Sequence, residues 1–186
     1  TSSLLSAAVD ANLQVIHQVV VLLPRLGRER YLERLAVCYH ASVGAHLRHI
    51  IEHYQAFLDG LADARIDYEH RARDRAIEAD PKVALTALAD VAQRLGALRM
   101  TGPDRTLAIA SETAPGSAAP SSLLRELEFL LSHTVHHYAL IATLARLQGV
   151  EPEPTFGVAP STLKFQQQDN AHVHGNVARQ EDGYDL

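Results

Sequence analysis

The sequence predicts an all-α fold, a four-helix bundle with an extended C-terminal tail. Hydrophobic residues make up 47% of the chain and aromatic residues only 5%, and the dominance of Leu and Ala among them favours helices over strands. Four long segments carry apolar residues at helical spacing. A polar connection separates the second segment from the third, and there is no internal repeat. The 186 residues fit one domain, or one domain with a tail.

The first helix is expected to run to about Leu23. Ser2 and Ser3 can cap its start, because a serine hydroxyl accepts a hydrogen bond from a free N–H of the first turn. Pro24 and Gly27 break the helical pattern after Leu23. The apolar residues of this helix recur every three or four positions: Leu5, Val9, Leu13, Ile16, Val20 and Leu23.

A short helical turn is expected within residues 28–40, and a second long helix from about Ser42 to Leu61. Residues 66–80 are charged and irregular, which predicts a connection without regular structure. The second helix carries an apolar stripe with a period near 3.6 residues: Val43, Leu47, Ile50, Ile51, Tyr54, Phe57, Leu58 and Leu61.

The third helix begins at a recognisable start signal. Asp80 can cap it, and Pro81 suits its first turn because the ring presets the helical φ angle. The helix is expected to end near Met100. Residues 105–120 then read as a loop, in which residues 106–110 are a candidate for one short strand.

The fourth helix is expected to start after Ser121 and Ser122, either of which can cap it. It continues to about Gln148 and stops at Gly149, since glycine tolerates the left-handed conformation that ends many helices. This is the longest of the predicted helices.

The sequence predicts that the chain has three parts. Residues 1–150 are predicted to form the helical bundle. Residues 151–168 are predicted to form a C-terminal extension packed on that bundle. Residues 169–186 are polar and lack periodicity, so we expect a flexible tail.

The composition argues against several classes of protein. The net charge is −5, whereas a nucleic-acid surface needs clustered lysines and arginines. A single cysteine, Cys38, rules out an internal disulfide and fits a reducing cytosol. We count no apolar run of about 18 residues, the length of a membrane span, and see no signal peptide. We therefore expect a cytoplasmic protein with no nucleic-acid or membrane partner.

The placement of the eleven histidines predicts a metal site. His133 and His137 are four residues apart, so they lie one turn above each other on one helix face. Two imidazoles in an H-x-x-x-H pair can bind one ion. Apolar neighbours such as Leu130 and Ile141 indicate that this face points into the bundle.

The second helix carries a matching stripe of His46, His49 and His53. A third ligand from this stripe would leave one metal position open for water or substrate, as in catalytic sites. A single buried histidine is more often a hydrogen-bonded core residue, but two histidine-rich helices in one small bundle favour the metal. The other histidines are interpreted as surface or tail residues: His17, His40, His70, His172 and His174.

The motifs in residues 44–53 and 132–138 resemble those of the DinB/YfiT-like superfamily, bacterial metal-binding four-helix-bundle proteins, and the resemblance covers residues 1–150. It implies a divalent metal ion held by one histidine of the second helix and two of the fourth. His133 and His137 match without ambiguity. His49 is the best match on the second helix, with His53 as the alternative. Three imidazoles suit zinc, nickel or iron.

The resemblance also implies the function. Relatives include thiol-dependent transferases and isomerases, and a domain of iron-dependent sulfoxide synthases. Two chemistries compete, namely activation of a low-molecular-weight thiol at the open position and hydrolysis of an ester or amide by a metal-activated water. We expect a metal-dependent enzyme that acts on a small molecule and forms a homodimer. The alternative is a non-catalytic metal-binding module for stress response or interaction, acting as a dimer.

Four further residues are candidates near the metal. Glu126 lies two turns before His133 and is either an outer partner or base or a solvent-facing carboxylate at a helix start. Arg48 and Arg71 are candidates to bind a substrate carboxylate or phosphate, or they belong to a solvated charge cluster. Tyr138 is a candidate substrate contact, although a tyrosine on an amphipathic helix is more often a packing residue.

Overall fold

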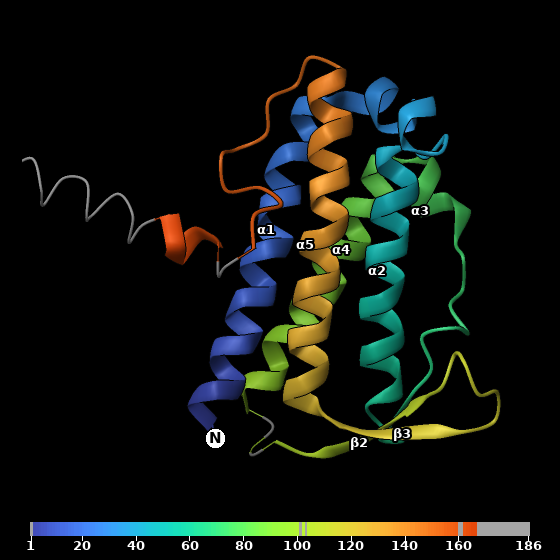
Figure 1. Ribbon diagram of the computed structural model, residues 1–186, viewed down its shortest axis with the longest axis vertical. Coiled ribbons are helices and arrows are strands. Elements are labelled where there is room, and N and C mark those ends of the chain that lie inside the picture. Colours follow the sequence, from blue (N-terminus) through green and yellow to red (C-terminus); the bar gives the residue numbers. More distant parts are fainter. Residues whose placement is uncertain (1, 101, 103, 160–161, 167–186) are drawn as a thin grey trace, which may run out of the picture.

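Long helices lie side by side in the computed structural model, which describes residues 2–100, 102, 104–159 and 162–166 (Figure 1). Helices α1 and α2 each pack against both α4 and α5. The described part of the chain is mostly helical, as predicted. The predicted tail, with His172 and His174, lies outside the described residues. The long helices are α1 (Ser2–Leu32), α2 (Val43–Gly60), α4 (Pro81–Ala97) and α5 (Leu123–Leu147), and the short helical segments include Ala36–Cys38, α3 (Arg75–Ala79), Leu98–Met100 and residues 162–166.

Helix α1 does not end at Leu23 as predicted. Pro24 lies inside the helix, and Gly27 departs from helical geometry with φ 72° and ψ 170°, which kinks the segment before it continues to Leu32. The continuation is favoured by burial, because Tyr31 is fully buried. The Tyr31 hydroxyl donates a hydrogen bond to the carbonyl of Ile77, 2.6 Å away. The helix therefore passes Pro24, whereas the predicted break at Gly27 is present as a kink between two helical stretches.

The Leu4–Leu32 stretch is long and apolar enough, by length and composition, to cross a membrane. The prediction that no such stretch exists was therefore too strict. Core helices of soluble proteins pass the same test, and the apolar residues Val9, Val19 and Leu22 of this stretch are buried on a helix that packs against α4 and α5.

The helices begin where the capping residues predict. The Ser42 hydroxyl accepts from the Ala45 amide at 3.0 Å and starts α2. Asp80 caps α4 in the same way, and Ser122 caps α5. Each cap satisfies a backbone N–H that the first helical turn leaves without a partner.

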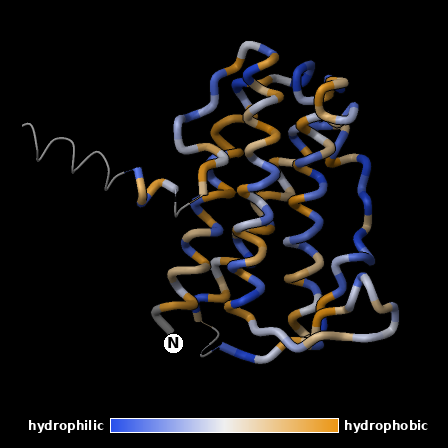
Figure 2. The backbone as a smooth tube through the Cα atoms, in the orientation of Figure 1, coloured by the Kyte–Doolittle hydropathy of each residue, from blue (hydrophilic) through white to orange (hydrophobic). Residues whose placement is uncertain are grey.

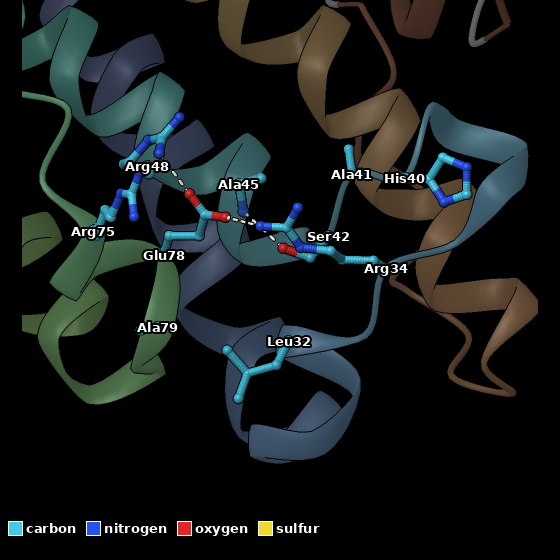
Figure 3. Close-up of a pocket in the computed structure, with 10 residues that line it drawn as sticks. All are labelled: Leu32, Arg34, His40, Ala41, Ser42, Ala45, Arg48, Arg75, Glu78 and Ala79. Atoms are coloured by element: carbon cyan, nitrogen blue, oxygen red, sulfur yellow. Dashed lines mark hydrogen bonds and ion pairs between the residues drawn. The ribbon is translucent and has the colours of Figure 1, made fainter.

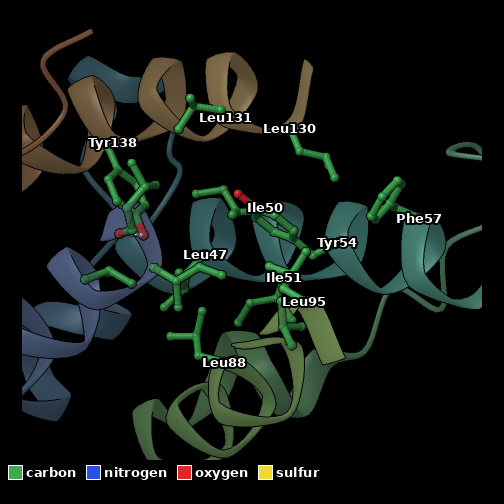
Figure 4. Close-up of a cluster of buried hydrophobic side chains, with 14 of the residues drawn as sticks. Leu47, Ile50, Ile51, Tyr54, Phe57, Leu88, Leu95, Leu130, Leu131 and Tyr138 are labelled. Atoms are coloured by element: carbon green, nitrogen blue, oxygen red, sulfur yellow. Dashed lines mark hydrogen bonds between the residues drawn. The ribbon is translucent and has the colours of Figure 1, made fainter. Parts of the chain in front are cut away.

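Apolar side chains from α2, α4 and α5 meet in the interior (Figure 4). Hydrophobic and hydrophilic positions alternate along each of the long helices (Figure 2), as expected for helices with one face turned to a core. The fully buried residues include Leu47, Ile50, Ile51, Tyr54 and Phe57 of α2, Leu88 and Leu95 of α4, and Leu130 and Tyr138 of α5.

A small three-stranded sheet corrects the all-α prediction. It contains β1 (Arg65–Ile66), β2 (Thr106–Ala110) and β3 (Ala118–Ser122) in that order, with β1 parallel and β3 antiparallel to β2. Strand β2 is the short strand that the sequence indicated. Strand β3 was missed because it contains Pro120, which an outer strand tolerates. The sheet lies across the ends of α2 and α5 (Figure 1).

The chain after α5 returns along that helix. Phe156 is buried, and its ring stacks on Tyr138 with the ring centres 4.5 Å apart. Gly157 comes so close that a Cβ atom there would lie 2.8 Å from the Tyr138 carbonyl carbon. These contacts concern only the first part of the segment predicted as a C-terminal extension.

Candidate metal centre

Six histidines gather where α2 faces α5. Spacings of three and four residues place three of them along one stripe of α2 and put His133 and His137 on one face of α5, with His136 exposed at the edge of that face. Ring contacts join the two stripes at several points. The six are His46, His49 and His53 on α2, and His133, His136 and His137 on α5.

His49, His53 and His133 form the most compact group. One nitrogen from each lies within 4.8 Å of the others, which is close enough for one metal ion. The Nε2 atoms of His49 and His133 are 3.1 Å apart. Two nitrogens that each bind a tetrahedral ion at about 2.0–2.1 Å lie roughly 3.4 Å from each other, so this pair already has the spacing of two ligands.

His137 lies beside this group. Its ring centre is 4.6 Å from those of both His49 and His133, and its Nδ1 is 3.2 Å from Nδ1 of His46. The structure thus brings together all the predicted ligands, including the alternative His53. His53 completes the compact group with His49 and His133, whereas His137 meets it through ring contacts.

The orientation of His53 is fixed by the backbone. Its Nδ1 lies 2.7 Å from the carbonyl oxygen of His49. A carbonyl can only accept, so Nδ1 carries the proton and Nε2 keeps its lone pair. Metal-binding histidines commonly donate their second ring nitrogen to a carbonyl in this way.

The cluster holds its imidazoles in the neutral form that binds metals. Burial, and then the neighbouring histidines, lower the pKa of His49 from 6.5 to about 3. The same causes, in the same order, lower the pKa of His133 to about 3 and that of His137 to about 4. The pKa values of His46 and His53 are also lowered, chiefly by burial.

Two of the ring nitrogens lack a hydrogen-bond partner within the described part of the chain. These buried atoms are Nδ1 of His133 and Nε2 of His46. A buried polar atom without a partner costs about 1–3 kcal/mol. The protein alone therefore leaves the cluster incompletely satisfied, as expected for a site that receives an ion or water.

An aromatic pair borders the histidines towards the sheet. The Tyr68 ring stacks on His53 with centres 5.5 Å apart, and Phe129 stacks on His133 at 5.7 Å. Phe129 was not predicted, although its position four residues before His133 places it on the same helix face. A small pocket of about 240 Å³ adjoins this pair, lined by Tyr68, Ile109, Ala110, Glu112, Arg125, Glu126 and Phe129.

Glu126 is buried, with 6% of its surface exposed, so it is not a solvent-facing residue. Its carboxylate accepts hydrogen bonds from the hydroxyls of Tyr68 at 2.8 Å and Ser121 at 2.5 Å. Burial, followed by the Glu126 charge, raises the pKa of Tyr68 well above its usual 10. Glu126 therefore reaches His53 through the Tyr68 ring.

A buried carboxylate links the cluster to the arginines. Glu52 is 3% exposed and accepts from the Asp74 amide at 2.6 Å. Its other oxygen lies 4.0 Å from the Nε atoms of Arg48 and Arg71, one on each side. Of these two arginines, Arg71 contacts the histidines, with its Nη1 3.4 Å from Nε2 of His53.

Arg48 faces a different pocket, of about 590 Å³ (Figure 3). Its guanidinium pairs with Glu78, which also accepts from Arg34 at 2.8 Å. The structure therefore does not bring Arg48 into contact with the candidate ligands. The pocket is lined by Leu32, Arg34, His40, Ala41, Ser42, Ala45, Arg48, Arg75, Glu78 and Ala79.

Tyr138 points away from the histidines. It is fully buried, and its hydroxyl donates to the carbonyl of Val15 on α1 at 3.0 Å. One residue further along a helix is a turn of about 100°, so His137 and Tyr138 face different neighbours. Tyr138 belongs to the packing between α5, α1 and Phe156.

Comparison with known proteins identifies the family. A sequence model of the DinB superfamily matches residues 4–141, a range that contains every histidine of the cluster. Searches of curated proteins and of solved structures found no match. The match spans most of the 186 residues, and the helices and histidines agree with it. The chain belongs to the DinB superfamily.

Proposed function

We propose that this protein is a metal-dependent enzyme that acts on a small molecule through a three-histidine site between α2 and α5. The observation that carries the proposal is the 3.1 Å separation of the His49 and His133 Nε2 atoms, with two further imidazoles in contact. We also propose that the long helices form the DinB-type four-helix bundle, and that the enzyme is a cytoplasmic homodimer. Zinc, nickel and iron all suit such ligands.

The residues around the cluster have separable roles in this proposal. His49 and His133 hold the ion together with His53 or His137. A bound divalent ion lowers the pKa of a thiol or a water at its open coordination position. This chemistry fits a thiol-dependent transferase or a hydrolase. Tyr68 and Phe129 shield one side of the site, and Glu126 fixes the Tyr68 ring through its hydroxyl.

Metal content is the first test. We expect near-stoichiometric metal, measured by mass spectrometry on tag-free protein, in the wild type. His49→Ala and His133→Ala should lose it. His136→Ala is the matched control, because this histidine is exposed on the same helix. A wild type that holds no metal even after reconstitution would overturn the proposal.

The thiol chemistry has its own test. Cobalt-substituted protein titrated with L-cysteine should develop a sulfur-to-metal charge-transfer band if a thiolate enters the open position. A cobalt spectrum that cysteine leaves unchanged would favour the hydrolase. Loaded protein that shows neither thiol binding nor hydrolysis of simple esters and amides would favour the non-catalytic module acting as a dimer.

A further inference from the structure

We propose that Arg71 recognises an anionic oxygen group of the substrate, a carboxylate, beside the open position of the metal. This inference rests on the proposed function and names the class of substrate. It concerns the segment between α2 and α3, which lies far from α5 in the sequence and still contributes a side chain to the cluster.

The Arg71 side chain is held in place and nearly enclosed. Only 12% of it is exposed. Its Nη1 donates to the Tyr68 carbonyl oxygen and lies 3.4 Å from Nε2 of His53. Its Nε is buried without a hydrogen-bond partner within the described residues, 4.0 Å from the nearest Glu52 oxygen. A guanidinium ordered in this way has donor capacity that the protein does not use.

Arg71 and a metal ion would compete for the same lone pair. Nδ1 of His53 donates to the His49 carbonyl, so Nε2 is the only nitrogen of this ring that can bind an ion. When an ion occupies Nε2, the Arg71 N–H that faces it loses its acceptor. That N–H then points at the coordination sphere, where an anion bound to the ion can accept it.

The charges favour an anion at this place. Histidine binds a metal ion as neutral imidazole, so the ligands do not offset the charge of a divalent ion. Arg71 adds another positive charge and is faced by two carboxylates, the exposed Glu69 at 3.9 Å and the buried Glu52 at 4.0 Å, which leave the charge of the ion unbalanced. A carboxylate that contacts both the ion and the guanidinium would balance this charge and gain a charge-assisted hydrogen bond.

The test uses two small probes on the cobalt-substituted full chain. Acetate is the anionic probe, and imidazole is the neutral probe that competes for the same open position. Each is titrated while the visible cobalt spectrum is followed. We expect Arg71→Gln to bind acetate about tenfold more weakly than the wild type and to bind imidazole equally well. Arg71→Lys should retain part of the acetate affinity, because it keeps the charge.

Two further variants control for charge and folding. Arg75→Gln removes an exposed arginine at the start of α3 and should leave both affinities unchanged. If Arg71→Gln folds poorly because Glu52 remains buried, the double variant Glu52→Gln/Arg71→Gln removes both charges and should show the same selective loss.

The outcomes separate this inference from the proposed function. Equal acetate affinity in the wild type and Arg71→Gln would overturn the role of Arg71, and so would a parallel loss of acetate and imidazole, which would mean that Arg71 only shapes the site. A wild type that gives no cobalt spectrum would instead overturn the metal site itself.

Discussion

The Nε2 atoms of His49 and His133 face each other across the contact between α2 and α5, 3.1 Å apart. The two residues are 84 positions apart in the chain. Two neutral imidazoles at this distance either share one proton in an N–H···N hydrogen bond or face each other with two lone pairs, and only the second arrangement can bind an ion between the two Nε2 atoms. The stability of the protein should therefore depend on what occupies the space between them.

Metal addition should stabilise the fold. A ligand that binds only the folded state at a hundred times its Kd adds about 2.7 kcal/mol to the free energy of unfolding. We expect zinc to raise the Tm of metal-free protein in calorimetry, and a chelator to reverse the increase. The Tm of His133→Ala should be unaffected by zinc, whereas His136→Ala should respond like the wild type. An equal shift in both variants would place the ion elsewhere.

The third ligand can be identified by paired substitutions. The compact group contains His53, whereas the family resemblance implies His137. If His53 is the ligand, His53→Ala should reduce zinc affinity by at least about tenfold, as even outer partners of metal sites do, and His137→Ala should have a smaller effect. Competition with a chromophoric chelator measures both. The reverse order would assign the role to His137.

On acidification, the metal-free protein should begin to lose stability at a higher pH than protonation of its carboxylates alone would cause. The pKa values of His49 and His133 fall to about 3, and that of His137 to about 4, from 6.5 when unfolded. Below pH 6.5 the unfolded chain therefore binds more protons than the folded chain, so the free energy of unfolding decreases as the pH is lowered. Urea denaturation between pH 7 and 5, above the usual range of carboxylates, should show this loss.

The matched variant for this effect is His49→Gln/His137→Gln. It removes two of the shifted groups, so its free energy of unfolding should depend less steeply on pH over the same range. An unchanged slope would mean that these histidines are protonated in the folded state.

Two helical glycines offer a matched test of packing. A Cβ at Gly44 would lie 2.3 Å from the Glu78 carbonyl oxygen, whereas a Cβ at Gly96 would meet nothing within 4 Å. We expect Gly96→Ala to stabilise the protein by about 0.5–1 kcal/mol through helix propensity. Gly44→Ala should destabilise it by about 1–3 kcal/mol. Denaturant unfolding of both variants measures the two changes in the free energy of unfolding. If both changes had the same sign, the close approach of α2 and α3 would be contradicted.

Tyr138→Phe separates packing from function. Its hydroxyl donates to Val15 on α1, so its removal should cost about 1 kcal/mol of stability. Metal content and acetate affinity should remain at wild-type values. If the variant lost metal content or acetate affinity but kept its stability, Tyr138 would again be a candidate substrate contact.

The sequence predicted those features that depend on local periodicity. Apolar spacing, with the caps at Asp80 and Ser122, located three of the long helices within a few residues. The i,i+4 spacing placed His133 and His137 on one face. These signals are local, because helical hydrogen bonds and side-chain neighbours lie within four residues.

The features that were missed depend on contacts between distant segments. Pro24 and Gly27 signal a helix end, but the burial of Tyr31 beside Ile77 extends α1 beyond them. Strand β3 contains Pro120 and forms only because β2 pairs with it. The contact of Arg71 with His53 depends on how the charged segment after β1 folds back over α2, and no spacing rule describes it.

The small sheet joins the ends of the two ligand-bearing helices. Strand β1 follows α2 after a short turn, strand β3 leads directly into α5, and β2 joins both strands by hydrogen bonds. The two ligand-bearing helices are therefore held together by backbone hydrogen bonds at one end, in addition to their direct packing. A change in the strands would move both helix ends without touching a histidine.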